Sequence, residues 1–273
     1  LYGNAPIKAI NGATRALSED GNNVYYGGDN PNDNSGVLKY VRVEYGGKKI
    51  GDGTSETNSM TFYAVGAGTV LENLVSYKGT DDGYEFFGGT VSGKNLVSYG
   101  NYDDSFDWQD SWSGQSNSNW FAFQTAIGNF GMEIESSGNA DNTAPKINNI
   151  TRIRETGTKP ETAGSIEMTA IQFKKHGSGI FSNVYMDGYK NTDSKNAYAV
   201  LIQDSATETE QVNKGKIKVE PANHVNSDNL NVWGYAFTPN GGKTFTSDSN
   251  VKKVTLTTGN WANVNGVEKK KKK

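Results

Sequence analysis

The sequence contains no cysteine, which excludes disulfide bonds, thiolate metal sites and cysteine nucleophiles. It has no apolar run of about 18 residues, the length that a membrane-spanning helix requires. The formal net charge is only -3, and the body of the chain shows no basic face for a nucleic-acid partner. The Gly-x-Ser-x-Gly, P-loop and His-Glu-x-x-His motifs are also missing. The sequence therefore gives no support to several common enzyme classes.

Hydrophobic residues are scarce and helical signals are weak. Hydrophobic residues make up 34% of the chain, while glycine alone contributes 33 residues. The one stretch of helical length, 156–168, contains Pro160 and two glycines, which favours a loop. This balance is typical of a fold with many turns and a thin, continuous core.

The segment Asn73–Gly114 contains two copies of one pattern at a 22-residue offset. The copies read NLVSYKGTDDGYEFFGGTVSGK and NLVSYGNYDDSFDWQDSWSG. Each has an apolar half followed by an acidic half. Repetition with a period near 20 residues predicts coils stacked on one another.

An asparagine followed by an apolar residue recurs beyond the two copies. It stands at Asn73, Asn95, Asn119, Asn149 and Asn183, with a sixth candidate at Asn229. We predict an all-β fold, a right-handed parallel β-helix with coils of about 22–30 residues and equivalent residues stacked about 4.8 Å apart. In such stacks the asparagines would hydrogen-bond one another, and Tyr45, Tyr77 and Tyr99 would form an aromatic row. An antiparallel sandwich is the alternative, but it would not require residue identity at a fixed offset.

The predicted organisation is a single β-helix domain over residues 1–267. Regular coils are expected from about 35 to 235, starting with a strand in 35–47, with irregular loops between strands. A C-terminal cap over the open end is expected at about 236–267, and 268–273 is a charged tail or tag.

The acidic halves are the first candidate site. Stacking places Asp81 on Asp103, Asp82 on Asp104 and Glu85 on Asp107, and like charges on neighbouring strands destabilise a sheet. A bound cation, neighbouring Lys or Arg side chains, or a carboxylate kept protonated would offset the repulsion. A calcium ion is the simplest of these, since calcium prefers oxygen ligands. The candidate ligands are Asp81, Asp82, Glu85, Asp103, Asp104, Asp107 and Asp110. The aspartates could instead cap turns by accepting backbone N–H groups.

Catalysis is a further possibility for the same residues. Paired carboxylates cleave glycosidic bonds, and Asp82 and Asp104 are the candidate acid and base. Arg152, Arg154 and His176 could complete a site for a sugar acid, although His176 would lie about three coils away.

Aromatic residues form the second candidate site. Trp108 and Trp112 are surrounded by polar residues and are expected to be exposed; with Tyr84 they could hold a sugar ring. Phe121 and Phe123 are expected in the core. The alternative is that the aromatic residues fill the coil interior.

Several segments carry a family resemblance: LYGNAPI, DNSGVLKYVRVEYGG, the stretch from TNSMTFYAV through DDSFDW, and GMEIES. They resemble a family of secreted bacterial β-helix proteins that are lipoprotein-like or carry labels such as multidrug transporter. The resemblance covers residues 1 to about 136 and is weak after Asn139. It implies a right-handed β-helix that is secreted or at the bacterial cell surface, and it implies no reaction.

These observations predict a secreted or cell-surface protein that binds a glycan or another surface, with a cation ordering the acidic face. The alternatives are a polysaccharide hydrolase or lyase, and a structural protein that associates end to end. No nucleic-acid partner and no membrane span are expected.

Overall fold

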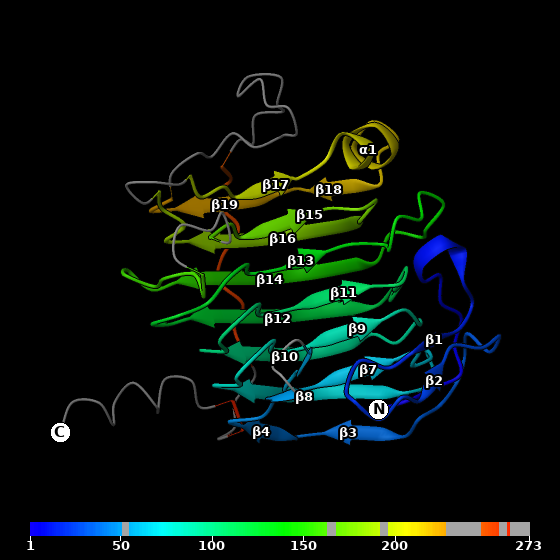
Figure 1. The fold of residues 1–273 in the computed structure, drawn as a ribbon. Coiled ribbons are helices and arrows are strands. Elements are labelled where there is room, and N and C mark those ends of the chain that lie inside the picture. Colours follow the sequence, from blue (N-terminus) through cyan, green and yellow to red (C-terminus); the bar gives the residue numbers. More distant parts are fainter. Residues whose placement is uncertain (51–54, 163–167, 192–195, 228–246, 257–260, 263–273) are drawn as a thin grey trace.

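The computed structural model describes residues 1–50, 55–162, 168–191, 196–227, 247–256 and 261–262. Within them the chain winds into stacked coils, and Figure 1 shows their strands rising from β3 and β4 to β17, β18 and β19. Equivalent strands of successive coils pair in parallel. The predicted parallel β-helix is therefore confirmed.

The larger sheet has nine strands and forms one side of the coils. Its central strands are long, and each pairs in parallel with the strands of the coils before and after it. The strands are β3 (Val37–Lys39), β4 (Arg42–Glu44), β8 (Val70–Tyr77), β10 (Gly93–Tyr99), β12 (Asn117–Gln124), β14 (Lys146–Arg154), β16 (Gly179–Asp187), β18 (Ile217–Val219) and β19 (Ala222–Val225).

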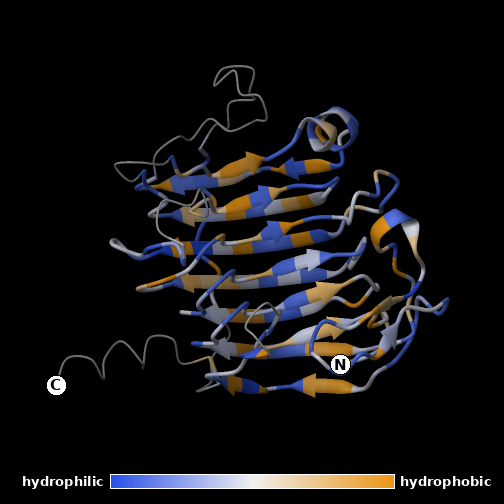
Figure 2. Ribbon diagram, viewed as in Figure 1, coloured by the Kyte–Doolittle hydropathy of each residue, from blue (hydrophilic) through white to orange (hydrophobic). Residues whose placement is uncertain are grey.

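The smaller sheet has six short strands and forms a second side of the coils. They are β7 (Thr61–Tyr63), β9 (Glu85–Phe87), β11 (Asp107–Gln109), β13 (Glu133–Ile134), β15 (Ile171–Phe173) and β17 (Val200–Ile202). Figure 2 shows hydrophobic and hydrophilic residues alternating along the stacked strands. This alternation is the period of two that sends neighbouring side chains to opposite faces.

The remaining elements belong to neither of these two sheets. They are the 3-10 turn η1 (Ile10–Gly12), the hairpin β1 (Ala16–Leu17) and β2 (Tyr25–Tyr26), the hairpin β5 (Lys48–Ile50) and β6 (Ser55–Thr57), and the short helices α1 (Ser205–Thr207) and η2 (Glu208–Val212). No helix among the described residues is long and apolar enough to cross a membrane.

A ladder of asparagines bends the long strands and joins their coils. Asn95 Nδ2 donates to Asn73 Oδ1 at 2.7 Å, Asn119 to Asn95 at 2.9 Å, and Asn149 to Asn119 at 3.1 Å. Each residue has a positive φ, a conformation that asparagine tolerates better than most residues. The predicted amide stack is thus confirmed from Asn73 to Asn149. Asn183 departs from it, because its Nδ2 donates to Asn148 Oδ1 at 2.7 Å.

At each end of the ladder another residue takes the place of asparagine, which the sequence pattern does not predict. In the first coil Tyr40 takes the bent position with a φ of 56°, and it splits the predicted 35–47 strand into β3 and β4. In the last described coil Pro221 lies opposite Asn183, because Val184 pairs with Ala222. Asn229, the sixth candidate, lies outside the described residues.

The predicted tyrosine row is present on the outer face of the nine-stranded sheet. The Tyr77 and Tyr99 rings stack with centroids 5.3 Å apart, and Phe123 continues the row at the same spacing. Phe121 and Phe123 face outward and are only partly buried, so their expected core position is wrong.

The described part of the C-terminal region lies over this row. Leu256, Trp261 and Ala262 pack against the cluster that contains Tyr77 and Tyr99. The backbone N–H of Val254 donates to Thr151 Oγ1 at 2.7 Å. The predicted cap spans 236–267; its residues 247–256 and 261–262 follow the outer face of the sheet, and 236–246 lie outside the described residues.

The coil interior is a continuous apolar core. From the six-stranded sheet it receives Phe62, Phe86, Trp108, Ile134, Phe173 and Ile202, which are consecutive partners in the register. The side chains between these core residues point outward from the same strands, and they form the candidate site described below. The first-coil edge at β3 and β4 exposes Val37, Tyr40 and Tyr45, and end-to-end association remains a prediction.

Candidate cation-binding groove

One row of side chains on the outer face of the six-stranded sheet is acidic. Glu85 of β9, Asp107 of β11 and Glu133 of β13 are successive partners in the parallel register. They point outward because their neighbours Phe86 and Trp108 point into the core. Coil stacking therefore places three carboxylates side by side.

This row forms the floor of a groove with a volume of about 340 Å³. Loops and hairpins from other coils complete its walls. We call it the acidic groove; it is lined by Glu19, Glu56, Asn58, Asp81, Asp82, Glu85, Asp107, Gln109, Glu133, Glu135, Lys174 and Lys175. Eight of these twelve residues carry carboxylates and two are lysines.

Three overlapping groups of carboxylates have oxygens within 4.8 Å of one another. The central group is Asp82, Glu85 and Asp107. The flanking groups are Asp81 with Asp82 and Asp103, and Asp104 with Asp107 and Glu133. Such separations are suited to ligands that share one cation.

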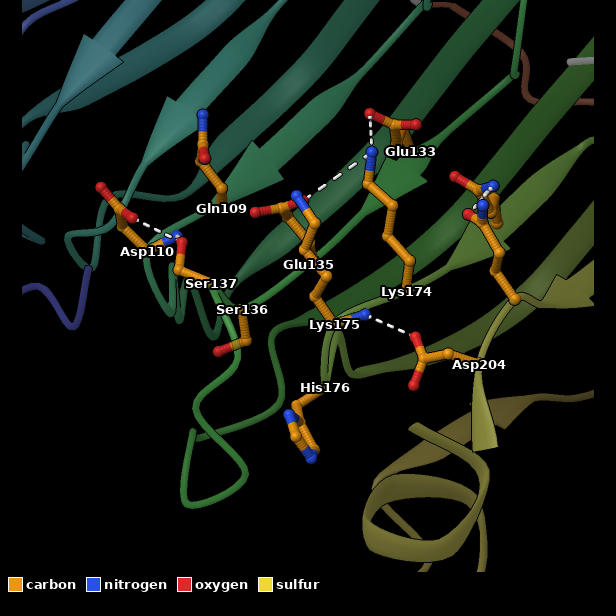
Figure 3. Close-up of polar contacts among 12 residues, drawn as sticks. Gln109, Asp110, Glu133, Glu135, Ser136, Ser137, Lys174, Lys175, His176 and Asp204 are labelled. Atoms are coloured by element: carbon orange, nitrogen blue, oxygen red, sulfur yellow. Dashed lines mark hydrogen bonds and ion pairs between the residues drawn. The ribbon is translucent and has the colours of Figure 1, made fainter. Parts of the chain in front are cut away.

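The two lysines neutralise only one end of the acidic groove. Lys174 Nζ lies 2.6 Å from Glu133 Oε2, and Lys175 Nζ lies 2.7 Å from Glu135 Oε2, as Figure 3 shows. Among the ion pairs of the described residues, none includes Asp82, Glu85 or Asp107. The central group therefore has no cationic side chain bound to it.

Burial and mutual repulsion make these carboxylates hard to ionise. Burial, then the charge of Glu133, hold the pKa of Asp107 well above its usual range, and the charge of Lys174 opposes this only in part. Burial, then Asp103 and Asp107, do the same to the pKa of Asp82. The pKa of Glu85 is likewise raised, first by burial and then by Glu19. A bound cation would reverse this effect, since an opposite charge favours the ionised form.

The flanking residues titrate nearer neutrality. Burial, with repulsion from Glu56, raises the pKa of Asp81 to about 6. Burial, with repulsion from Asp81, raises the pKa of Asp103 to about 7. Burial alone would lower the pKa of Lys174. The nearby charges of Glu133 and Asp107 outweigh burial and raise this pKa above its usual value, so Lys174 stays protonated and cannot act as a general base.

Two of the aspartates accept backbone hydrogen bonds from the next coil, and a third has an unpaired oxygen. Asp82 Oδ1 accepts the backbone N–H of Asp104 at 2.9 Å, and Asp104 Oδ1 accepts that of Phe130 at 2.5 Å. Both aspartates accept a backbone N–H, as the turn-capping alternative expects, but the donor lies on the next coil and not in the aspartate's own turn. Asp107 Oδ1, by contrast, is buried and has no hydrogen-bond partner.

Two sequence-based assignments change in the structure. Asp104 does not line the acidic groove, so Asp82 and Asp104 do not face a common ligand as an acid–base pair would. Asp110 belongs to none of the three carboxylate groups; it accepts hydrogen bonds from Tyr26 and Ser137 at 2.5 and 2.6 Å. Figure 3 shows the Asp110–Ser137 bond beside Gln109.

The predicted exposure of Trp108 and Trp112 is wrong. Each is 1% exposed, and their ring centroids lie 5.0 Å apart in the coil interior. Tyr84 is fully buried, and its hydroxyl donates to the carbonyl of Val97 at 3.0 Å. These residues have polar sequence neighbours because strands alternate, and they offer no surface to a sugar.

The expected sugar-acid residues do not reach the acidic groove. Arg152 is fully buried inside the coils, and Arg154 is 5% exposed. His176 follows Lys175 but lies outside the groove lining, pointing away from Glu135 in Figure 3.

Sequence reasoning also missed several groove residues. Glu133 and Glu135 lie on the floor, and Glu19 and Glu56 come from the two hairpins. The Glu133-Ile134-Glu135 triplet has the same outward–inward–outward pattern as Asp107-Trp108-Gln109, so aligning the two would have found the floor residues. No local pattern would have found the hairpin residues.

The donor set fits a hard cation such as calcium or magnesium. All three residues of the central group offer carboxylate oxygens, and the groove lining contains no histidine. Glu85 is held in place by the amides of Asn58 and Gln109, the latter at 3.1 Å. Orientation of the ligands by neighbouring groups is typical of metal sites.

The fold and the groove together define a parallel β-helix with an acid-lined groove on one sheet. The chain belongs to the family described as the pectate-lyase-like β-helix domain, whose model matches residues 1–270. No curated protein and no solved structure matches the chain.

Proposed function

We propose that the acidic groove binds a divalent cation, calcium fitting best, and that the ordered groove recognises a glycan. The observation that carries this proposal is the central group of Asp82, Glu85 and Asp107, whose oxygens lie within 4.8 Å of one another. No lysine or arginine in the described part of the chain forms an ion pair with this group, and the charge of Lys174 offsets that of Asp107 only in part. Calcium needs six to eight oxygen ligands, and sugar hydroxyls or water would supply those that the protein does not.

Adhesion at a bacterial surface, or after secretion, is the setting we propose for this binding. The resemblance of residues 1–136 to secreted bacterial β-helix proteins supports it. Extracellular modules often bind calcium with a Kd of about 10⁻⁴–10⁻³ M, and we expect an affinity in this range.

Calorimetric titration of calcium into metal-free protein tests the cation site. We expect saturable binding to the wild type and at least a tenfold weaker Kd for Asp107→Asn. Asp141→Asn is the matched control, because Asp141 is exposed and lies outside the groove. Absence of binding to the wild type, or equal binding to Asp107→Asn, would refute the proposed site.

A glycan array probed in calcium and then in chelator tests the ligand. Glycans that bind wild type in calcium should be lost in chelator and with Asp107→Asn, but kept with Asp141→Asn. If wild type binds calcium but no glycan, the cation site stands and the adhesion proposal fails.

Glycan cleavage is the second candidate function. It is favoured by membership of the pectate-lyase-like family and by groove carboxyls whose raised pKa values suit a general acid. Incubation with a panel of neutral and acidic polysaccharides, followed by assays for reducing ends and unsaturated products, tests it. Products that persist with both Glu85→Gln and Asp107→Asn would exclude these two carboxyls from the reaction.

A further inference from the structure

A second unbalanced charge lies inside the β-helix, on a residue that does not line the acidic groove. Arg152 is on β14, where its partners in the register are Ala122 of β12 and Met186 of β16, both core residues. Its side chain points between them, and the residue is 0% exposed. A guanidinium in this position has lost its water and needs compensation from the protein or from a ligand.

The protein supplies little of that compensation. No ion pair of the described residues includes Arg152, and its one side-chain hydrogen bond among them is a long contact of 3.5 Å from Nη1 to the carbonyl of Thr151. Burial lowers the pKa of Arg152 to about 9, which still leaves the side chain protonated at neutral pH. Arg154, two residues along the same inward row, adds another positive charge.

The unpaired donors have a definite geometry. Nε and Nη2 of Arg152 are buried and have no hydrogen-bond partner. These two atoms form one edge of the guanidinium, and their N–H groups point in parallel, which is the fork that binds anions bidentately. The Phe106 ring covers a flat face of the guanidinium, because Arg152 Cζ lies 4.7 Å from the ring centroid.

The surroundings restrict the size of any partner. Gly131 is adjacent, and a Cβ at that position would lie 2.9 Å from Arg152 Cδ and 2.8 Å from the Tyr189 hydroxyl oxygen. Tyr189 is itself buried and donates to Gln124 Oε1 at 3.1 Å. A large ligand would not fit beside these groups.

We propose that the Nε and Nη2 edge of Arg152 binds a small monovalent anion of the halide class, with chloride as the physiological ion, inside the β-helix. The anion neutralises the buried guanidinium and satisfies both unpaired donors. A water molecule would accept these hydrogen bonds but leave the charge uncompensated. This site is independent of the acidic groove and of the function proposed for it.

Crystallography tests the site directly. Wild-type protein is exchanged into bromide and crystallised, and anomalous diffraction then locates the bromide ions. The expected result is an anomalous bromide peak within hydrogen-bonding distance of both Nε and Nη2. Anomalous peaks confined to the protein surface, or no peak at all, would overturn the proposal and indicate water at the fork.

Thermal unfolding in sodium salts of chloride, bromide and methanesulfonate at equal ionic strength gives a second readout. Wild type should gain about 3–5 °C in Tm for each tenfold rise in chloride above its Kd, with no such gain in methanesulfonate. Arg152→Met should lose the anion dependence. Arg42→Met is the matched control, because Arg42 also stacks on an aromatic ring, Tyr77, but on the outer face.

An anion dependence that is equal in wild type and Arg152→Met would overturn the proposal. If Arg152→Met does not fold, the bromide diffraction on wild type decides the question alone.

Discussion

The two outer faces of this β-helix stack like on like, with opposite energetic results. On the nine-stranded sheet, asparagine lies on asparagine and tyrosine on tyrosine, and each pair attracts. On the six-stranded sheet, Glu85 lies beside Asp107 and Asp107 beside Glu133, and each pair repels. The coils and the parallel pairing are the same, so the difference comes from the side chains alone.

Self-complementarity explains the contrast. An amide has both a donor and an acceptor, and an aromatic ring has a face that packs on its copy, so both gain from being repeated. An ionised carboxylate only accepts, and its copy adds repulsion. The nine-stranded face is therefore a structural device, while the six-stranded face is best explained by an external ligand.

The largest expected effect separates the core from both faces. Trp108→Ala should lower the free energy of unfolding by about 3–5 kcal/mol, because it empties a fully buried site between Trp112 and Trp120. Urea denaturation measures it, and a loss below about 1 kcal/mol would contradict the buried position.

The next effect tests the stabilising face. Asn95→Ala should cost about 2–4 kcal/mol, because Asn95 both donates and accepts in the ladder and has a φ of 56°. Asn95→Gly is the matched control: it keeps the backbone conformation and should lose only the hydrogen bonds, about 1–2 kcal/mol. Equal losses in the two variants would mean that the positive φ is not costly here.

The repelling face should respond in the opposite direction. In chelator at pH 7.5, Asp107→Asn should raise the free energy of unfolding by about 1–2 kcal/mol, since it removes one of the crowded charges. In saturating calcium the same variant should be less stable than wild type, because it has lost a ligand. Paired denaturation curves in the two buffers measure the change of sign, and a loss in both buffers would argue against repulsion.

The smallest effect is the pH dependence of the metal-free protein. The pKa values of Asp81 and Asp103 are raised to about 6 and 7, above those of the unfolded chain. The folded state thus binds more protons, and its stability falls as pH rises from about 4 to 7. Tm in chelator should be higher at pH 5.5 than at pH 7.5, and calcium should narrow the gap. A Tm that rises with pH in chelator would contradict this.

Much of the fold was predictable because stacked coils place similar residues at regular offsets in the sequence. The offsets of 22, 24 and 30 between ladder asparagines are the offsets of the hydrogen-bonded pairs. The groove was predictable in part: Glu85 and Asp107 follow from the repeat, but Glu19 and Glu56 come from hairpins that the repeat does not include. Polar sequence neighbours do not predict exposure of Trp108 and Trp112, because alternate residues of a strand face opposite sides.

The sequence alone determined the coil, its register and the stacking of carboxylates, because parallel pairing makes a repeat in sequence a row in space. Only the tertiary structure decided which side of each strand faces outward and which loops close over the acidic row. It alone brought Lys174 and Lys175 to one end of the groove and left Arg152 unpaired in the core. Those outcomes depend on contacts between residues distant in the chain, which no local pattern records.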